Sequence, residues 1–437
     1  MPPWPRPRTL RTSDEGMDAS APVGPASRHG DLNRRWVIIG LLFASTFLNY
    51  FDRQTLSILK PVLKGEFGFD DNGYANIVSA FMITYVIAYT LAGRLVDRAG
   101  SRISLTLFVS VWSIANLLTG LAQTIGHLLA CRAVLGAAEP GNYPAALRAA
   151  TTWFPDRLRG IATSIYQSGS ATAAVIAMPV VAYVAARWGW RTAFVLPGIV
   201  GLLWAVAWWR IYRAPSAEYA PHPPQGEPGR APWSQLLRHP ALWGIVLARL
   251  VSDQVWYFCL FWMPGYFQEN LKLTLIAAGL IGWVPFLVAD LSGIASGLVS
   301  DRLVRGGHTP RQARLRVLTL TALLAPCAML IPFAPGVGVV IGLFCVVAAV
   351  CQIWLFNVTT LVADTFPRTS VASVLGVAGS FGALGGLFSS KLIGTFVGSV
   401  GYTPVFLALG CFHLLAAGIL RYFLRFDPPP LSEGKTN

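Results

Sequence analysis

The chain alternates between long apolar blocks and short polar segments. Each block is about 20 residues long or longer and is rich in Leu, Val, Ala and Gly. A helix needs about 20 mainly apolar residues to cross the hydrocarbon core, where only helices and closed barrels satisfy their backbone groups. The alternating pattern of barrel strands is absent from these blocks. The pattern therefore predicts an all-α membrane protein.

We expect twelve membrane-spanning helices, six in each half of the chain. The first six cover residues 36–58, 74–96, 103–122, 126–150, 159–184 and 190–212. The second six cover residues 240–266, 274–299, 313–333, 336–360, 370–396 and 402–424. Residues 35–212 and 240–425 are then two six-helix bundles, joined by a Pro-rich linker over residues 213–239. Residues 1–34 form a disordered N-terminal tail, and residues 426–437 form a C-terminal tail.

Composition and charge support this prediction and add an orientation. Charged residues make up 12% of the chain, half of the roughly 25% that is usual in soluble domains. Arginines recur in the tails, in the linker and in every second loop, which the positive-inside rule assigns to the cytoplasm. We therefore expect a multi-pass protein of the inner (plasma) membrane with both termini in the cytoplasm. An anionic lipid leaflet accounts for the net charge of +14, so no nucleic-acid partner is expected.

Several classes of protein lack support in the sequence. No H-E-x-x-H, G-x-S-x-G or P-loop motif occurs, which argues against a membrane enzyme and a nucleotide-driven pump. The six cysteines lie inside apolar blocks without C-x-x-C spacing, so we expect no metal and no cofactor. A transporter-like sensor would need an added signalling domain, and both tails are short.

An internal repeat follows the second helix of each half. Residues 93–98 read G-R-L-V-D-R and residues 297–302 read G-L-V-S-D-R. The first copy continues to Arg102 as G-x-L-x-D-R-x-G-x-R, which resembles the signature loop of the major facilitator superfamily. An ordinary turn with stop-transfer charges is the alternative interpretation. The resemblance implies a major facilitator fold, with two pseudo-symmetric six-helix bundles and a cytoplasmic gate formed by Gly93, Asp97, Arg98, Arg102, Gly297, Asp301 and Arg302.

Four charged residues lie well away from the ends of the first and fourth predicted helices: Asp52, Arg53, Arg132 and Glu139. Intramembrane charges are costly and usually face a partner or a polar pathway. The guanidinium groups suit an anionic substrate, ideally a carboxylate, and the carboxyl groups can change protonation with their exposure. We expect the four to form one polar cluster, either for proton-coupled anion uptake or as a static salt-bridge network.

The same region carries a narrower resemblance. N-Y-x-D-R at residues 49–53 and R-x-x-x-G-x-x-E-x-x-x-x-P from residue 132 are similar to the anion:cation symporter branch of the superfamily. W-F-P-x-x-x-R-G at 153–160, L-A-R at 247–249 and F-W-x-P at 261–264 also resemble that branch. The likeness covers nearly the whole chain except the tails and most of the linker. Members of the branch that this chain resembles are proton-driven importers of organic anions, often hexuronates, aldonates or aldarates.

The resemblance implies roles for individual residues. Asp52 and Glu139 are expected to couple protons, while Arg53 binds the substrate carboxylate and Arg132 regulates Glu139. Further substrate contacts are expected at Tyr85, Arg132, Ser170, Asn357 and Ser380, to which we add Gln167 because it lies one helical turn before Ser170.

Other polar residues lie in the predicted helices outside this cluster. Arg249 and Asp253 are four apart, so we predict a satisfied ion pair across one helical turn rather than a gate or a substrate contact. Lys391 departs from the branch pattern, and we expect it to snorkel to the outer interface rather than contact a second carboxylate. Gln254 also departs from the pattern, and Asp290 has no obvious partner in the sequence.

The resulting prediction is a monomeric proton-coupled symporter that imports an organic anion, such as a hexuronate, by alternating access. The rival hypotheses are an exporter or antiporter of another organic anion or drug-like compound, and a transporter-like membrane sensor. A Gly-Pro-rich signature typical of drug antiporters is absent from the fifth helix, which reads S-G-S-A-T-A-A at 168–174.

Overall fold

The computed structural model describes residues 25–425 except 155, 214, 216–232 and 367. Most of both predicted tails and most of the linker therefore lie outside the described residues. Two short parts of these segments are helical: residues 25–34 extend the first helix, and Trp233–Arg238 form a short helix before the second half. Every regular element among the described residues is a helix.

The first half contains eight helical elements. They are α1 (Pro25–Ile58), α2 (Lys60–Phe67), α3 (Asp71–Gly120), α4 (Ile125–Ala138), η1 (Glu139–Gly141), α5 (Asn142–Trp153), α6 (Asp156–Trp188) and α7 (Trp190–Ile211). The second and third predicted helices together form α3, which is broken only at Gly100. The fourth predicted helix is divided into α4, η1 and α5 around Pro140.

The second half contains ten helical elements. They are α8 (Trp233–Arg238), α9 (Pro240–Phe261), α10 (Met263–Glu269), α11 (Leu275–Gly282), α12 (Val284–Arg305), α13 (Pro310–Ala322), η2 (Ala325–Phe333), α14 (Val337–Thr365), α15 (Arg368–Val400) and α16 (Thr403–Leu424).

Helices occupy all twelve ranges that the apolar blocks predict. Nine of them, among the described residues, are long and apolar enough to cross a membrane. The other three ranges, 36–58, 74–96 and 126–150, are also helical. The first and third of these hold Asp52, Arg53, Arg132 and Glu139, and such charges lower the mean hydropathy of a helix. The prediction of an all-α membrane fold is therefore confirmed.

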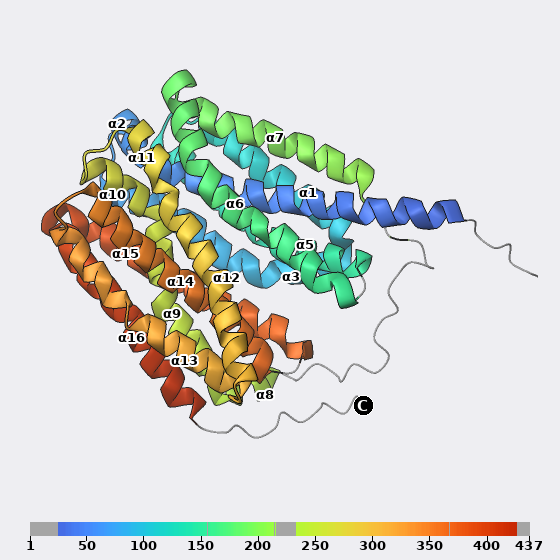
Figure 1. Ribbon diagram of the computed structural model, residues 1–437. Coiled ribbons are helices and arrows are strands. Elements are labelled where there is room, and N and C mark those ends of the chain that lie inside the picture. Colours follow the sequence, from blue (N-terminus) through green and yellow to red (C-terminus); the bar gives the residue numbers. More distant parts are fainter. Residues whose placement is uncertain (1–24, 155, 214, 216–232, 367, 426–437) are drawn as a thin grey trace, which may run out of the picture.

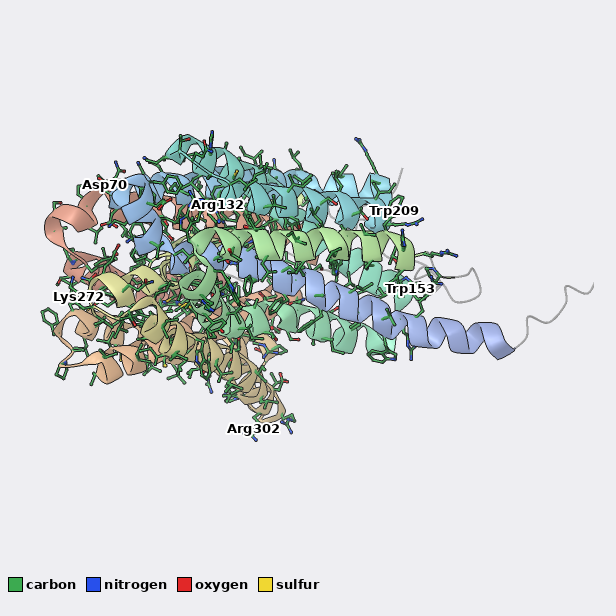
Figure 2. All side chains as sticks on the ribbon, turned by 90° about the horizontal axis from the view of Figure 1, so that it is seen from above. Asp70, Arg132, Trp153, Trp209, Lys272 and Arg302 are labelled. Carbon is green, nitrogen blue, oxygen red and sulfur yellow. The ribbon has the colours of Figure 1, made fainter. Side chains whose placement is uncertain are left out.

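The two bundles meet closely at one end and diverge at the other (Figure 1). The divergent end carries the start of α1 and the short helix α8, and we call it the terminal end; the opposite one is the far end. Asp70 and Lys272 lie at the far end, whereas Trp153 and Trp209 lie at the terminal end (Figure 2).

Small residues line two places where the bundles touch. A Cβ atom on Gly279 of α11 would lie 2.6 Å from the Ala182 side chain of α6. On the other side, a Cβ atom on Gly394 of α15 would lie 2.3 Å from the Ala75 side chain of α3. Glycine at both positions lets helices from opposite bundles approach almost backbone to backbone.

Candidate functional site

Charged residues from both bundles meet at the far end. The Lys60 ammonium, whose side chain is 0% exposed, lies 2.7 Å from the Asp71 carboxylate and 2.9 Å from that of Glu269. Lys64 lies 3.1 Å from Asp71 and 3.2 Å from Glu269. We call Lys60, Lys64, Asp71 and Glu269 the far-end cluster. Because Glu269 belongs to the second bundle and the others to the first, the cluster joins the two halves.

The far-end cluster also sets the charge state of its members outside the spans. Partial burial would raise the pKa of the Asp71 carboxyl, but Lys60 and Lys64 outweigh it and hold the pKa below its ordinary 3.8. Burial would lower the pKa of the Lys64 ammonium, but Glu269 and Asp71 raise it above 10.5. The Lys60 ammonium also lies over the Trp262 ring, at 4.7 Å from its centroid. The contacts of Asp71 and Lys64 favour the charged forms of these two residues at neutral pH.

Arg53 and Glu139 form a buried ion pair within the first bundle. Nε and Nη2 of Arg53 donate to Oε2 of Glu139 at 3.0 and 2.6 Å. The two side chains are only 7% and 0% exposed. The helix that carries Glu139 lies directly against α3, because a Cβ on Gly136 would come within 2.1 Å of the Phe81 carbonyl oxygen. A larger residue than glycine at 136 would push Glu139 away from Arg53.

Aromatic rings surround the Arg53 guanidinium. Its Cζ atom lies 5.0 Å from the centroid of Tyr50, 5.3 Å from that of Phe81 and 4.9 Å from that of Tyr85. Cation–π attraction strengthens when the cation is desolvated, as it is here. The structure thus places Tyr85 beside Arg53, where the resemblance implied a substrate contact.

Asp52 has a partner that the sequence analysis missed. Nδ2 of Asn116, in α3, donates to Oδ1 of Asp52 at 2.9 Å and to the carbonyl oxygen of Phe194 at 3.2 Å. Asp52 and Asn116 are both 0% exposed. An asparagine in the middle of an apolar block was the signal for this contact, since buried amides need partners.

Arg132 is buried near both carboxylates without an identified bond to either. It is 2% exposed, and among the described residues its Nε and Nη2 atoms have no hydrogen-bond partner. The charges of Asp52 and Glu139 both act on it. The predicted cluster of four therefore consists of one direct ion pair, Arg53–Glu139, with Asp52 and Arg132 close by.

A second buried ion pair lies in the other bundle. Nε and Nη2 of Arg249 approach Oδ2 of Asp253 at 2.9 and 2.7 Å, and both side chains are 15% exposed. This confirms the ion pair that the four-residue spacing predicts. Nη1 of Arg249 and the ring of Tyr89, from the first bundle, both lie 3.9 Å from the position of a Cβ on Gly379. Arg249 thus lies where the two bundles face each other.

The other predicted substrate contacts are not brought together with Arg53 by any bond that we identify. Ser170 donates to the carbonyl oxygen of Gln167 at 2.8 Å, and Ser380 donates to that of Gly376 at 3.0 Å. Asn357 is 1% exposed and donates to Ser296 at 2.9 Å, between α14 and α12. Its role as a substrate contact stays a prediction.

At the terminal end, the predicted gate residues make contacts within their own bundles. Arg102 donates to the Trp209 carbonyl oxygen at 2.6 Å, and Asp301 accepts from Arg314 at 3.2 Å. Arg98 and Arg302 are exposed, and the side chain of Asp97 lies outside the described residues.

The two predicted gate glycines have open space beside them. A Cβ on Gly93 or Gly297 would meet no described atom within 4 Å. The bundles diverge at this terminal end (Figure 1). The role of these residues as a cytoplasmic gate stays a prediction.

Two further polar residues have identified partners. The Lys391 ammonium donates to Asn72 at 2.8 Å and to Asn76 at 2.5 Å across the bundle interface. Neither acceptor is a carboxylate, and the expected snorkelling of Lys391 stays a prediction. Asp290 has a partner after all, since Gln352 donates to its carboxylate at 3.2 Å.

These features define the class of protein: a multi-spanning membrane protein of two helical bundles, with buried ion pairs in each. Residues 42–390 match the family model of the Major Facilitator Superfamily, and the chain belongs to this family. It is therefore a membrane transporter and not an enzyme, as the sequence predicts.

The chain is similar to curated transporters over nearly its whole length. It is 29% identical to the hexuronate transporter of Escherichia coli (strain K12), an alignment that covers 90% of this chain and 95% of the relative. It is 28% identical to the probable galactarate/D-glucarate transporter GudP of Bacillus subtilis (strain 168), over 93% and 95%.

A solved structure shares the fold. This is a bacterial homolog of the human lysosomal transporter Spinster, in an inward-facing and occupied conformation, with a TM-score of 0.74 and 19% identity over 90% of this chain and 97% of that one.

Proposed function

We propose that the protein imports a sugar acid, such as a hexuronate, together with protons. The observation that carries this proposal is the buried Arg53–Glu139 pair. A guanidinium with three N–H groups left over can bind a carboxylate, and a carboxylic acid beside it can take up a proton. The curated relatives are named as transporters of hexuronates and of galactarate or D-glucarate, which supports the same class of substrate.

Protonation of Glu139 would release Arg53 to the substrate. In the empty site the Glu139 carboxylate neutralises Arg53, so the pair is buried without net charge. When Glu139 takes up a proton, the guanidinium loses its anionic partner and binds the substrate carboxylate instead. Asp52, which accepts a bond from Asn116 but has a second buried oxygen without a described donor, is the other proton carrier.

Alternating access would follow from the arrangement of the bundles. Their bonds at the far end and their divergence at the terminal end correspond to a state open toward the terminal end. We place the terminal end in the cytoplasm, because the arginine-rich loops lie there. The predicted gate residues then close this end in the opposite state.

Uptake of radiolabelled glucuronate, galacturonate and galactonate into proteoliposomes tests the proposal. With acid outside, we expect gradient-dependent accumulation of at least one of them. Arg53→Ala removes the anion-binding group and should abolish uptake, whereas Glu139→Gln should retain exchange but lose accumulation. Arg187→Ala, at an exposed arginine, is the control for reconstitution. No uptake of any sugar acid, with export of drug-like cations instead, would refute the proposal.

A further inference from the structure

The two bundles each hold one buried arginine in the same way. Arg53 lies in α1 and Arg249 in α9, which hold the first predicted span of each half. Each guanidinium uses Nε and Nη2 to bind a single carboxylate oxygen, Oε2 of Glu139 or Oδ2 of Asp253. Two of the five N–H groups are thereby occupied, and three remain for a ligand.

Tyrosine rings connect the two arginines across the interface. Tyr85 lies 4.9 Å from Arg53, and its ring centroid is 5.8 Å from that of Tyr89. Tyr89 and Arg249 flank the same point beside Gly379. Tyr257 adds a phenol from the second bundle, and the charges of both Arg53 and Arg249 act on it. Tyrosine rings of the first bundle thus run from Arg53 to the point beside Gly379 that Arg249 also flanks.

Resting on the proposed function, we propose that this site prefers a sugar acid with a carboxylate at each end, an aldarate, over a hexuronate or an aldonate. Arg53 binds one carboxylate, Arg249 binds the other, and the tyrosine hydroxyls face the hydroxyls of the sugar chain. Arg249 is then the residue that determines specificity for the second carboxylate. Asp253 neutralises Arg249 in the empty site, which lowers the cost of burying it.

Sequence identity cannot choose between these substrates, because the relatives named for hexuronate and for galactarate or D-glucarate are 29% and 28% identical. The hydrogen-bonding capacity of the two arginines favours the second class, because each keeps N–H groups that its own carboxylate does not use. A substrate with one carboxylate would bind Arg53 and leave the remaining N–H groups of Arg249 unused. A substrate with two carboxylates binds the first helix of each bundle and links their movement.

The test compares galactarate and glucarate, which have two carboxylates, with galacturonate and galactonate, which have one, in proteoliposomes. Arg249→Gln should lower galactarate uptake at least tenfold at limiting concentration, and galactonate uptake by less than twofold. Arg249→Lys keeps the charge and should give an intermediate loss of galactarate. Asp253→Asn removes the internal competitor and should lower the KM for galactarate. Arg305→Gln, at an exposed arginine, is the matched control.

Three outcomes would overturn the inference. One is uptake of galactonate but not galactarate by the unaltered protein, which would leave the proposed function standing. Another is equal loss of both substrate classes in Arg249→Gln and Arg249→Lys, which would make Arg249 a structural residue. The third is unchanged galactarate uptake in both variants. Absence of uptake of any of the four acids would instead refute the proposed function itself.

Discussion

At the residue scale, Asp52 and Glu139 are both buried but are held by different donors. Glu139 accepts two bonds from the Arg53 guanidinium, while Asp52 accepts one from the neutral amide of Asn116. Both carboxylates accept charge-assisted bonds when ionised, but Glu139 also faces a full positive charge, whereas Asp52 faces a neutral amide. The two buried carboxyl groups therefore have different surroundings, which supports the proposal that they act at different steps.

Asn116→Leu is expected to change the pH dependence of uptake. The amide stabilises the ionised carboxylate of Asp52, and a bond to a charged group contributes about 1.5 kcal/mol, or roughly one pH unit. Without it, the protonated form persists to higher pH, so the external pH at half-maximal uptake should rise by about one unit. Uptake rates measured across a series of external pH values would show this.

Thr119→Val is the control for that experiment. Thr119 is also 0% exposed and lies one turn further along α3, but its hydroxyl bonds the Ala115 carbonyl oxygen of its own helix. We expect its pH profile to match that of the unaltered protein. The same profile in Asn116→Leu would show that the amide does not act on Asp52.

Individual contacts differ in whether they could be predicted from the sequence. The Arg249–Asp253 pair could be predicted because the two residues are neighbours on one helix. The bond between Asn116 and Asp52 joins residues 64 apart in the chain, and that between Lys60 and Glu269 joins residues 209 apart. Such pairings depend on which helices pack against each other, and the periodicity of a single helix carries no information about its neighbours. The bond between Lys391 and Asn72 was not predicted for the same reason, because Asn72 lies in the other bundle.

At the scale of elements, the far-end cluster ties α2 and α3 to α10. Lys60 is fully buried, whereas the Lys64 side chain is 26% exposed and is screened by water. Removing one partner from a buried ion pair costs about 3–5 kcal/mol, while exposed pairs contribute about 0–1 kcal/mol. Because the Asp71 and Glu269 side chains are 18% and 23% exposed, an intermediate value applies to Lys60.

Lys60→Met is therefore expected to destabilise the protein by about 2 kcal/mol, against less than about 1 kcal/mol for the matched variant Lys64→Met. Thermal unfolding of the purified protein in detergent, followed by tryptophan fluorescence, measures both. Equal effects of the two substitutions would contradict the argument from burial.

The pH dependence of this difference follows from the pKa shifts. The pKa of Asp71 is lowered, so its contribution is present above pH 3.8 and is lost only as pH falls below that value. The pKa of Lys64 is raised, so its contribution is present below pH 10.5 and is lost only above it. We expect the effect of Lys64→Met on the free energy of unfolding to stay constant between about pH 5 and pH 9. Asp71 and Lys64 then keep fixed charges in that range and do not sense protons.

At the scale of the whole molecule, the helical fold could be predicted because the bilayer imposes it. All twelve predicted ranges are helical in the structure. The observed helices extend beyond the predicted ends where polar residues continue a helix, as at residues 25–34. The relative position of the bundles could not be predicted, because it differs between states of a transporter. This is why the gate residues are found apart.

The orientation in the membrane can be tested with single cysteines in a variant whose six native cysteines are replaced. Arg187→Cys, at the far end of α6, should react with a membrane-impermeant maleimide added to intact cells. Arg305→Cys, at the end of α12, should react only after permeabilisation. Both arginines are exposed, so access to the reagent is limited by the membrane alone. The reverse labelling pattern would place the termini outside.

The glycine contacts between the bundles have a mechanical consequence. Gly279 faces Ala182, and Gly394 faces Ala75, so each seam between the bundles is nearly smooth near the far end. Interlocking side chains resist rotation, whereas smooth surfaces let one bundle roll on the other. If the bundles rock as proposed, the axis of rotation lies near these two seams. A small rotation there would move the terminal ends of the bundles apart by a much larger distance.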